Sequence, residues 1–334
     1  MKLTAIAPLT ENPSPLTLTE SEVPVPGDRE VLIRVATCGV CHTEIDEIEG
    51  RTPPPVLPVT PGHQVVGQVV DLGPGVQRLS PGQRVGVGWI YRSDGSSREN
   101  LAAEFQATGR DVDGGYADFM LADERYAALV PNTLTDREAA PLLCAGAVGY
   151  RALMRASLTD GEALGLTGFG GSGHLVLQMA RFLYPRSPVY VYARSQTEQA
   201  FALELGADWA GDTGAQAPAA PQAIIDTTPA WKPVLAALSA VRPGGRVVIN
   251  AISKEAGDRQ LLADLDYASQ LWREKTLTSV ANVTADDVAC ALGLAAKAGI
   301  RPTVEAWPLE KANEALLKVR AGHLRGAQVL DMSL

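Results

Sequence analysis

The sequence predicts an α/β protein whose two parts are built differently. Up to about residue 140, short apolar runs lie between turns rich in Pro and Gly, a pattern typical of β structure. After Pro141, strand-like apolar segments alternate with segments of helical periodicity, which predicts a parallel sheet with right-handed crossovers. The length of 334 residues fits two domains, and the 46% apolar and 20% charged residues are ordinary for a folded soluble protein.

In the first part, strands are expected where apolar runs are bounded by turn sequences, at Val31–Ala36, Val65–Val70 and Arg84–Val87. Pro53–Pro55 predicts an extended loop, because each proline ring fixes φ and disfavours helix for its neighbour. Tyr91–Asp113 is polar and irregular, and we expect it to form a surface lobe.

In the second part, the expected elements alternate between strand and helix, and Gly211–Pro221 is expected to be a surface loop. Strands are expected at Ala163–Thr167, Val189–Tyr192, Ile224–Ile225, Arg246–Ile249 and Ala327–Leu330. Helices are expected at Leu175–Leu183, Glu198–Leu205, Trp231–Val241, Ala285–Lys297 and Leu309–Ala321.

Charge and cysteine content exclude several classes of function. The net charge of −9 disfavours nucleic acid and anionic membranes as main partners, since both require a basic surface. No signal peptide or membrane span is recognisable, so a cytoplasmic protein is expected. Four cysteines in so long a chain exclude a disulfide scaffold and leave metal binding, catalysis or burial. They are Cys38, Cys41, Cys144 and Cys290.

The segment Gly168–Gly173 matches the pattern G-x-G-x-x-G between an expected strand and an expected helix. Gly168 permits the tight turn, and Gly170 and Gly171 leave the backbone open to a pyrophosphate. Gly173 lets the helix pack on the strand, and the helix N-terminus favours phosphate. The pattern predicts a Rossmann dinucleotide site, although a plain turn between strand and helix is the alternative.

The end of the second strand indicates which cofactor is used. NAD-selective sites place Asp or Glu about 20 residues after the glycines to accept from the ribose 2′-hydroxyl. No acid occurs from Ser187 to Thr197, where Arg194 and Ser195 follow the strand instead. Because Arg pairs with a 2′-phosphate, we expect NADP(H) rather than NAD(H). Alternatively, Arg194 stacks on the adenine or points to solvent.

Three residues far apart in the sequence are candidate metal ligands: Cys41, His63 and Cys144. Two thiolates and an imidazole suit tetrahedral Zn²⁺ with one open position. Each residue alone would also fit simple burial. Cys38 and Cys41 form a CxxC, which leaves a redox pair as a further alternative.

Five segments carry a family resemblance: Cys38–Glu44, Pro61–Gly67, Leu143–Tyr150, Gly168–Gly173 and Arg242–Val248. In this order they resemble the zinc-dependent alcohol dehydrogenases of the medium-chain dehydrogenase/reductase superfamily, over essentially the whole chain. The resemblance implies a β-rich GroES-like catalytic domain at 1–144 and 282–334, and a doubly wound Rossmann domain at 145–281. It also implies a homo-oligomer, dimer or tetramer, that acts on a small alcohol or aldehyde.

The resemblance also implies residue roles. It makes Cys41, His63 and Cys144 the ligands of a catalytic zinc. Thr43 would take the alcohol proton, and Glu44 would orient the His63 ring. The other contacts it implies are His42 and Arg325 for the cofactor phosphates, and Trp89, Ile48 and Thr52 for the substrate pocket.

Three departures from the family pattern are visible. Trp89–Gly115 contains no cysteine, so no structural zinc is expected, although Arg98–Leu101 still resembles the segment of the family's zinc lobe. Gln64 stands where a Glu is usual, which removes a negative charge near the metal. Asp46 stands where a His often ends the proton relay, so it either passes a proton to solvent or is simply a solvated acid.

These observations predict hydride transfer between NADP(H) and a primary alcohol or aldehyde. Ile48 and Thr52 stand where some relatives specific for small alcohols carry aromatics, which predicts a roomier pocket for medium-sized substrates. Two alternatives stay open: a zinc-free quinone or enoyl reductase of the same superfamily, and a nucleotide-binding protein without catalysis.

Overall fold

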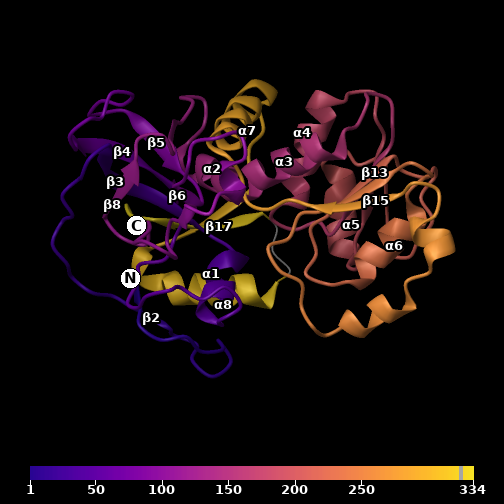
Figure 1. Ribbon diagram of the computed structural model, residues 1–334, viewed down its shortest axis with the longest axis horizontal. Coiled ribbons are helices and arrows are strands. Elements are labelled where there is room, and N and C mark those ends of the chain that lie inside the picture. Colours follow the sequence, from indigo (N-terminus) through magenta and orange to yellow (C-terminus); the bar gives the residue numbers. More distant parts are fainter. Residues whose placement is uncertain (323–325) are drawn as a thin grey trace. The chain divides into compact units, whose positions relative to one another are not determined.

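The computed structural model describes residues 1–322 and 326–334 (Figure 1). The chain forms two compact units, Met1–Ala147 with Asn282–Leu334, and Val148–Ala281. These are called unit 1 and unit 2 below and are described separately. The helices in the described part of the chain are too short or too polar to cross a membrane. The predicted α/β class is confirmed.

Unit 1 is built on a sheet of seven strands in which β3 is central. Its neighbours pair antiparallel, except that β16 and β17 run parallel. The order is β16 (Val304–Trp307), β17 (Ala327–Asp331), β3 (Glu30–Val40), β4 (Val65–Leu72), β5 (Arg84–Val87) and β9 (Ala127–Leu129), with β8 (Phe119–Asp123) also on β3. The three strands expected in this part are therefore present, two of them longer than expected.

Short elements surround this sheet. The pair β1 (Lys2–Leu3) and β2 (Leu16–Thr17) forms one small ribbon. A second ribbon, β6 (Ile90–Arg92) with β7 (Gln106–Ala107), and the 3₁₀ turn η1 (Glu99–Leu101) lie in the expected surface lobe. The lobe is therefore more ordered than the sequence indicated, and Glu99 and Asn100 are buried in it.

Two helices of unit 1, α2 (Asp136–Pro141) and α7 (Ala285–Ala298), begin at capping boxes that join a threonine to an acid three residues later. Thr135 and Glu138 cap α2, and Thr284 and Asp287 cap α7. At Pro141 the helix widens into the π turn η2 (Leu142–Gly146), against which α7 packs. Leu309–Ala321, expected as one helix, is a 3₁₀ turn at Leu309–Lys311 followed by α8 (Ala312–Ala321).

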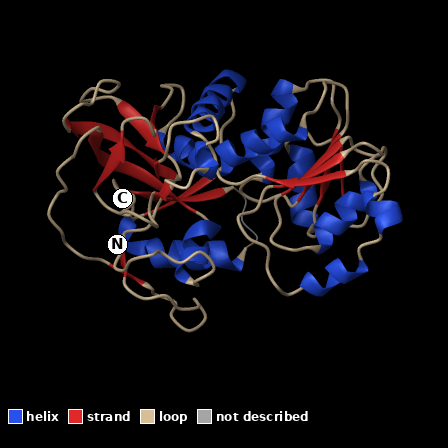
Figure 2. Ribbon diagram, viewed as in Figure 1, coloured by secondary structure: helices blue, strands red, loops and turns tan. Residues whose placement is uncertain are grey.

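Unit 2 is a sheet of six parallel strands in the order β12-β11-β10-β13-β14-β15. When the strands of this unit are numbered 1 to 6 along the chain, their order in the sheet is 3-2-1-4-5-6, which is the order of dinucleotide-binding doubly wound sheets. Figure 2 shows helices on both sides of it. The strands are β10 (Leu164–Thr167), β11 (Val189–Tyr192), β12 (Trp209–Gly211), β13 (Ala223–Asp226), β14 (Arg246–Ile249) and β15 (Thr276–Ser279).

The helices of unit 2 follow these strands closely. They are α3 (Ala147–Ala156), which enters the unit, α4 (Gly173–Leu183), α5 (Gln196–Glu204) and α6 (Lys232–Ala240), with shorter turns at η3 (Arg259–Asp264) and η4 (Tyr267–Leu271). Because β10 lies next to β13, the strand order reverses there. Ligands of such sheets bind at that switch point, beyond the carboxyl ends of the strands.

Candidate metal centre and dinucleotide site

Unit 1 brings the three candidate ligands together. The Sγ atoms of Cys41 and Cys144 and a ring nitrogen of His63 lie within 4.8 Å of one another. Cys41 Sγ lies 3.7 Å from His63 Nε2, and His63 is buried whereas both cysteines are partly exposed. Donors of this kind at this separation fit one tetrahedral zinc with a fourth position left for another ligand.

Each ligand is placed by a local feature of the chain. Cys41 is the N-cap of α1 (His42–Ile48), and Cys144 lies in the π turn η2. His63 follows Gly62, whose φ of 103° and close contact with Tyr116 exclude a side chain at that position. A π turn at a ligand position agrees with the frequent occurrence of such turns at functional sites.

Glu44 fixes the His63 ring. Its Oε1 lies 2.7 Å from His63 Nδ1, while its Oε2 accepts from the Cys41 backbone N–H at 2.9 Å. Both side chains of the ion pair are buried. With Nδ1 engaged by the carboxylate, Nε2 is left to face the two sulfurs, which is how acids commonly orient ligating histidines.

The electrostatics of this cluster favour a cation. A hydrogen bond with Cys144, followed by burial and by the charge of Glu44, raises the pKa of the Cys41 thiol well above its ordinary value. A bound divalent cation inverts this situation, because a coordinating thiol is deprotonated outright. The donor set therefore fits zinc.

Three more expected residues lie beside the ligands. The Trp89 ring stands at 87° to the His63 ring with a centroid distance of 4.6 Å, and it is almost fully buried. Thr43 is buried, and its backbone N–H donates to Cys41 Sγ at 3.4 Å. Gln64 is buried, and its Nε2 has no hydrogen-bond partner among the described residues.

Two of the expected residues, Asp46 and Ile48, are buried on α1. Asp46 is only 2% exposed and forms an ion pair with Arg51, so the view of it as a solvated acid is wrong. Ile48 is fully buried in the hydrophobic core of unit 1, and its place in a substrate pocket stays a prediction. Both side chains point inward because α1 buries most of its surface. Thr52 is half-buried, and His42 is exposed at the start of α1.

The CxxC does not have the properties of a redox pair. Cys38 is fully buried in the core, and a side chain on Gly62 would collide with its Sγ at 2.9 Å. Burial among Glu44 and other groups raises the pKa of the Cys38 thiol well above its ordinary value. A buried thiol of this kind is inert, because the thiolate is the reactive form.

The glycine turn of unit 2 has the geometry the sequence predicts. Gly168 has φ of 80°, and a side chain there would meet Thr227 and Thr228 at 2.9 Å. At Gly170 and Gly171 an added Cβ would meet nothing within 4 Å, so the backbone is open to a ligand. Gly173 begins α4, and its Cβ would lie 2.7 Å from Gly168 O.

One residue of this turn was missed by sequence reasoning. His174 is buried, and its Nδ1 lies 3.0 Å from the Gly170 carbonyl oxygen. Burial lowers the pKa of His174, so the ring is neutral and Nδ1–H donates to that oxygen. The His174 side chain thus holds the glycine turn in place from the start of α4. In the sequence, the only sign of this role is a histidine next to the last glycine of the motif.

The residues expected to choose the cofactor lie after β11. Arg194 is exposed and makes no ion pair with another described residue, whereas the Ser195 hydroxyl accepts from Glu198 N–H and caps α5. Arg325 lies outside the described residues.

Comparisons with known proteins decide the family. The profile of the alcohol dehydrogenase GroES-like domain matches residues 27–132. The probable alcohol dehydrogenase AdhA of Mycobacterium tuberculosis is 37% identical over 327 residues, covering 95% of this chain and 92% of that protein. The chain belongs to the alcohol dehydrogenase family. An alcohol dehydrogenase of Geobacillus stearothermophilus is 32% identical, covering 95% of this chain and 96% of its own length.

A solved structure of the same family supports the fold. The cinnamyl alcohol dehydrogenase SbCAD4 from Sorghum bicolor superposes with a TM-score of 0.79 at 27% identity, covering 94% of this chain and 93% of that one. As a member of the alcohol dehydrogenase family, the chain is an NAD(P)-dependent oxidoreductase with a candidate Cys–His–Cys metal centre.

Glu99 anchors the lobe of this alcohol dehydrogenase. Its Oε1 accepts from the Ala285 N–H at 2.7 Å, at the start of α7, and its Oε2 accepts from the Tyr126 hydroxyl at 3.0 Å. Burial and the charge of Glu99 raise the pKa of Tyr126 to about 12. One buried carboxylate thus ties the lobe to a strand end and to a helix N-terminus, where negative charge is favoured.

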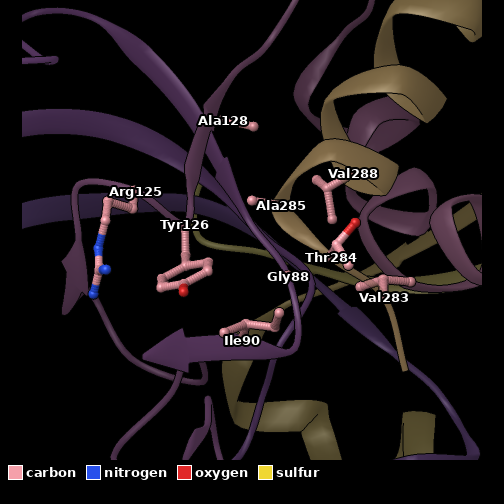
Figure 3. A pocket seen from close by; sticks show the side chains of 9 residues that line it. All are labelled: Gly88, Ile90, Arg125, Tyr126, Ala128, Val283, Thr284, Ala285 and Val288. Atoms are coloured by element: carbon pink, nitrogen blue, oxygen red, sulfur yellow. The ribbon is translucent and has the colours of Figure 1, made fainter. Parts of the chain in front are cut away.

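The cavity beside Tyr126 is not a substrate site. Its volume is about 20 Å³, enough for about one water molecule. Figure 3 shows Ile90, Tyr126 and Val288 among the residues that line it. We conclude that this cavity is a packing gap next to the Glu99 anchor.

Removing the Glu99 charge is expected to loosen this lobe. Glu99→Gln should lower the free energy of unfolding by about 1–3 kcal/mol, because the amide has one acceptor oxygen in place of two and carries no negative charge at the start of α7. Urea unfolding monitored by tryptophan fluorescence measures the loss. Glu104→Gln, an exposed change in the same lobe, is the control. Equal stability of the two variants would contradict the anchor.

Proposed function

We propose that the chain is a zinc-dependent alcohol dehydrogenase that transfers hydride between NADP(H) and primary alcohols or aldehydes. The observation that carries this proposal is the convergence of Cys41, His63 and Cys144 in unit 1. The strand order of unit 2 and the open backbone at Gly170 and Gly171 support a dinucleotide as the hydride carrier.

The zinc would be held by Cys41, His63 and Cys144. When bound, it supplies Lewis acidity toward the oxygen of the alcohol or carbonyl substrate. Glu44 holds the His63 ring in the orientation that ligation needs. Trp89 packs against that ring and excludes water from one side of the centre.

Proton movement is assigned to two residues of α1. The Thr43 hydroxyl, on a buried side chain next to Cys41, takes the proton of the alcohol. Asp46 lies three residues further along the helix and is the proposed end of the relay, with Arg51 as its partner at the edge of the protein. Gln64 is neutral and supplies no carboxylate next to His63, so the proposed proton transfer depends on Thr43.

We propose one catalytic zinc and no structural zinc. The lobe between Trp89 and Gly115 has no cysteine, and Glu99 supplies the ties that hold it. Metal analysis separates the alternatives. About one zinc per chain supports the proposal, two contradict the missing structural site, and none favours a zinc-free quinone or enoyl reductase. Family membership disfavours the non-catalytic alternative.

NADP(H) is the proposed cofactor because Arg194 is exposed directly after β11 where no acid lies. Arg194→Ala is therefore expected to raise the KM for NADPH about tenfold or more while changing the KM for NADH little, since only NADPH carries a 2′-phosphate. Initial rates with both cofactors test this. Arg155→Ala, at another exposed arginine of unit 2, is the control. An equal effect on both cofactors would contradict the assignment.

Medium-sized primary alcohols and aldehydes are the proposed substrates, with aldehyde reduction as the favoured direction. The size argument rests on the absence of an aromatic side chain at Ile48, which is buried, and at Thr52, which is half-buried. Rates across aldehydes of rising chain length test it, and reaction only with acetaldehyde-sized substrates would refute it.

The proposed assembly is a homo-oligomer, either a dimer or a tetramer, because of the family resemblance. The proposed location is the cytoplasm, because of the composition.

A further inference from the structure

A buried ion pair lies at the carboxyl edge of the unit 2 sheet, outside the residues considered so far. Asp226 is the last residue of β13 and is fully buried, and the Lys254 side chain is only 9% exposed. Lys254 lies in the segment that follows β14. The remainder of β10 and β13 consists of buried apolar residues, glycine and one threonine, so this pair is the one ionic contact at the described ends of these strands.

Both side chains of the ion pair also make hydrogen bonds to neighbouring residues. Lys254 Nζ contacts Asp226 and also donates to the carbonyl oxygens of Thr228, at 2.7 Å, and Ala230, at 3.0 Å. All three ammonium donors are thereby used. Asp226 Oδ1 also accepts from the Thr167 hydroxyl at 2.6 Å and from the Thr228 hydroxyl at 2.8 Å.

These bonds join the ends of neighbouring strands. Thr167 ends β10, Asp226 ends β13, and Lys254 follows β14. Thr227 closes the connection to the glycine turn, because its hydroxyl donates to the Thr167 carbonyl oxygen at 3.0 Å and its side chain lies against Gly168. Asp258 ties the same segment to the start of α6 through the Trp231 and Lys232 N–H groups.

Stability alone does not account for such a pair. Replacing a buried ion pair by apolar residues is often neutral or stabilising, because desolvation of the charges offsets their attraction. The position of the ion pair in the sheet explains its presence better. The pair lies at the switch point between β10 and β13, and it fixes two segments of the second mononucleotide-binding half of the sheet, which begins at β13.

We propose that Asp226 and Lys254 are positioning residues that hold the β13–α6 connection and the segment after β14 in place for the nicotinamide half of the cofactor. The inference rests on the proposed dinucleotide binding. The adenosine half belongs to the glycine turn and the end of β11. Lys254 contacts neither of them, and Asp226 reaches the glycine turn only through the Thr167 hydroxyl. Disrupting the pair should therefore weaken binding of the whole cofactor and spare its adenosine fragment.

The test compares two probes on the purified protein. NADPH binding is followed by its fluorescence, and 2′,5′-ADP binding by calorimetry; NADH and ADP replace them if the wild type prefers NADH. Lys254→Met is expected to raise the Kd of NADPH about tenfold or more and to leave the Kd of 2′,5′-ADP within twofold. Lys232→Met, at an exposed lysine that begins α6, is the control and should change neither.

A second variant separates positioning from folding. In Asp226→Asn combined with Lys254→Met, no buried charge is left unpaired, so the melting temperature should return toward that of the wild type while NADPH binding stays weak. Restored NADPH affinity in the double variant, or equal loss of both probes in Lys254→Met, would overturn the inference. A wild type that binds neither NADPH nor NADH would instead contradict the proposed function.

Discussion

Cys144→Ala is expected to lower kcat/KM for alcohol oxidation at least about a thousandfold and to reduce bound zinc to a small fraction of one per chain. The magnitude corresponds to several kcal/mol of transition-state stabilisation, the contribution of a metal Lewis acid. The physical reason is that Cys41 and His63 alone offer only two of the three protein ligands that a catalytic zinc needs. Steady-state rates and metal content of the same preparation measure both effects.

Cys290→Ala is the matched control for this change. Cys290 is an exposed free thiol on α7, and Cys144 lies in the π turn against which that helix packs. The control should keep wild-type turnover and zinc. A Cys144→Ala protein that is folded, turns over normally and holds its zinc would remove Cys144 from the centre.

Thr43→Val is expected to lower kcat for alcohol oxidation by about 10²–10⁴-fold without changing the zinc content. Valine keeps the shape of the buried threonine but has no hydroxyl to take the proton of the alcohol. Thr43→Ser, which retains a hydroxyl, should keep most of the activity. Stopped-flow measurement of NADPH formation with a primary alcohol reports the rate of this step. Wild-type rates in the valine variant would contradict the proton relay.

Local sequence signals predicted the elements that depend on local chemistry. Arg84–Val87, Val189–Tyr192 and Arg246–Ile249 are strands with the expected bounds, because apolar runs between turn residues specify a buried strand by themselves. The glycine turn was predictable for the same reason, since tight turning and close approach require glycine at fixed spacings. β12 and β15 were missed, because the first is short and the second is a largely exposed edge strand.

The candidate site depends on contacts that the sequence does not show locally. Convergence of Cys41 and Cys144 needs both the start of α1 and a π turn after Pro141, and neither has a distinct sequence signal. The burial of Asp46 and Ile48 could not be predicted, because burial of nearly every side chain of α1 follows from its packing in unit 1 and not from its polar sequence. The role of Glu99 likewise requires a partner 186 residues away.

Zinc K-edge X-ray absorption of the purified protein tests the metal centre most directly. The account predicts one zinc per chain with two sulfur ligands at about 2.3 Å and one imidazole nitrogen at about 2.0–2.1 Å. Absence of zinc would contradict the account. So would an average of more than two sulfur ligands per zinc, which is the result that an additional four-cysteine zinc site would give.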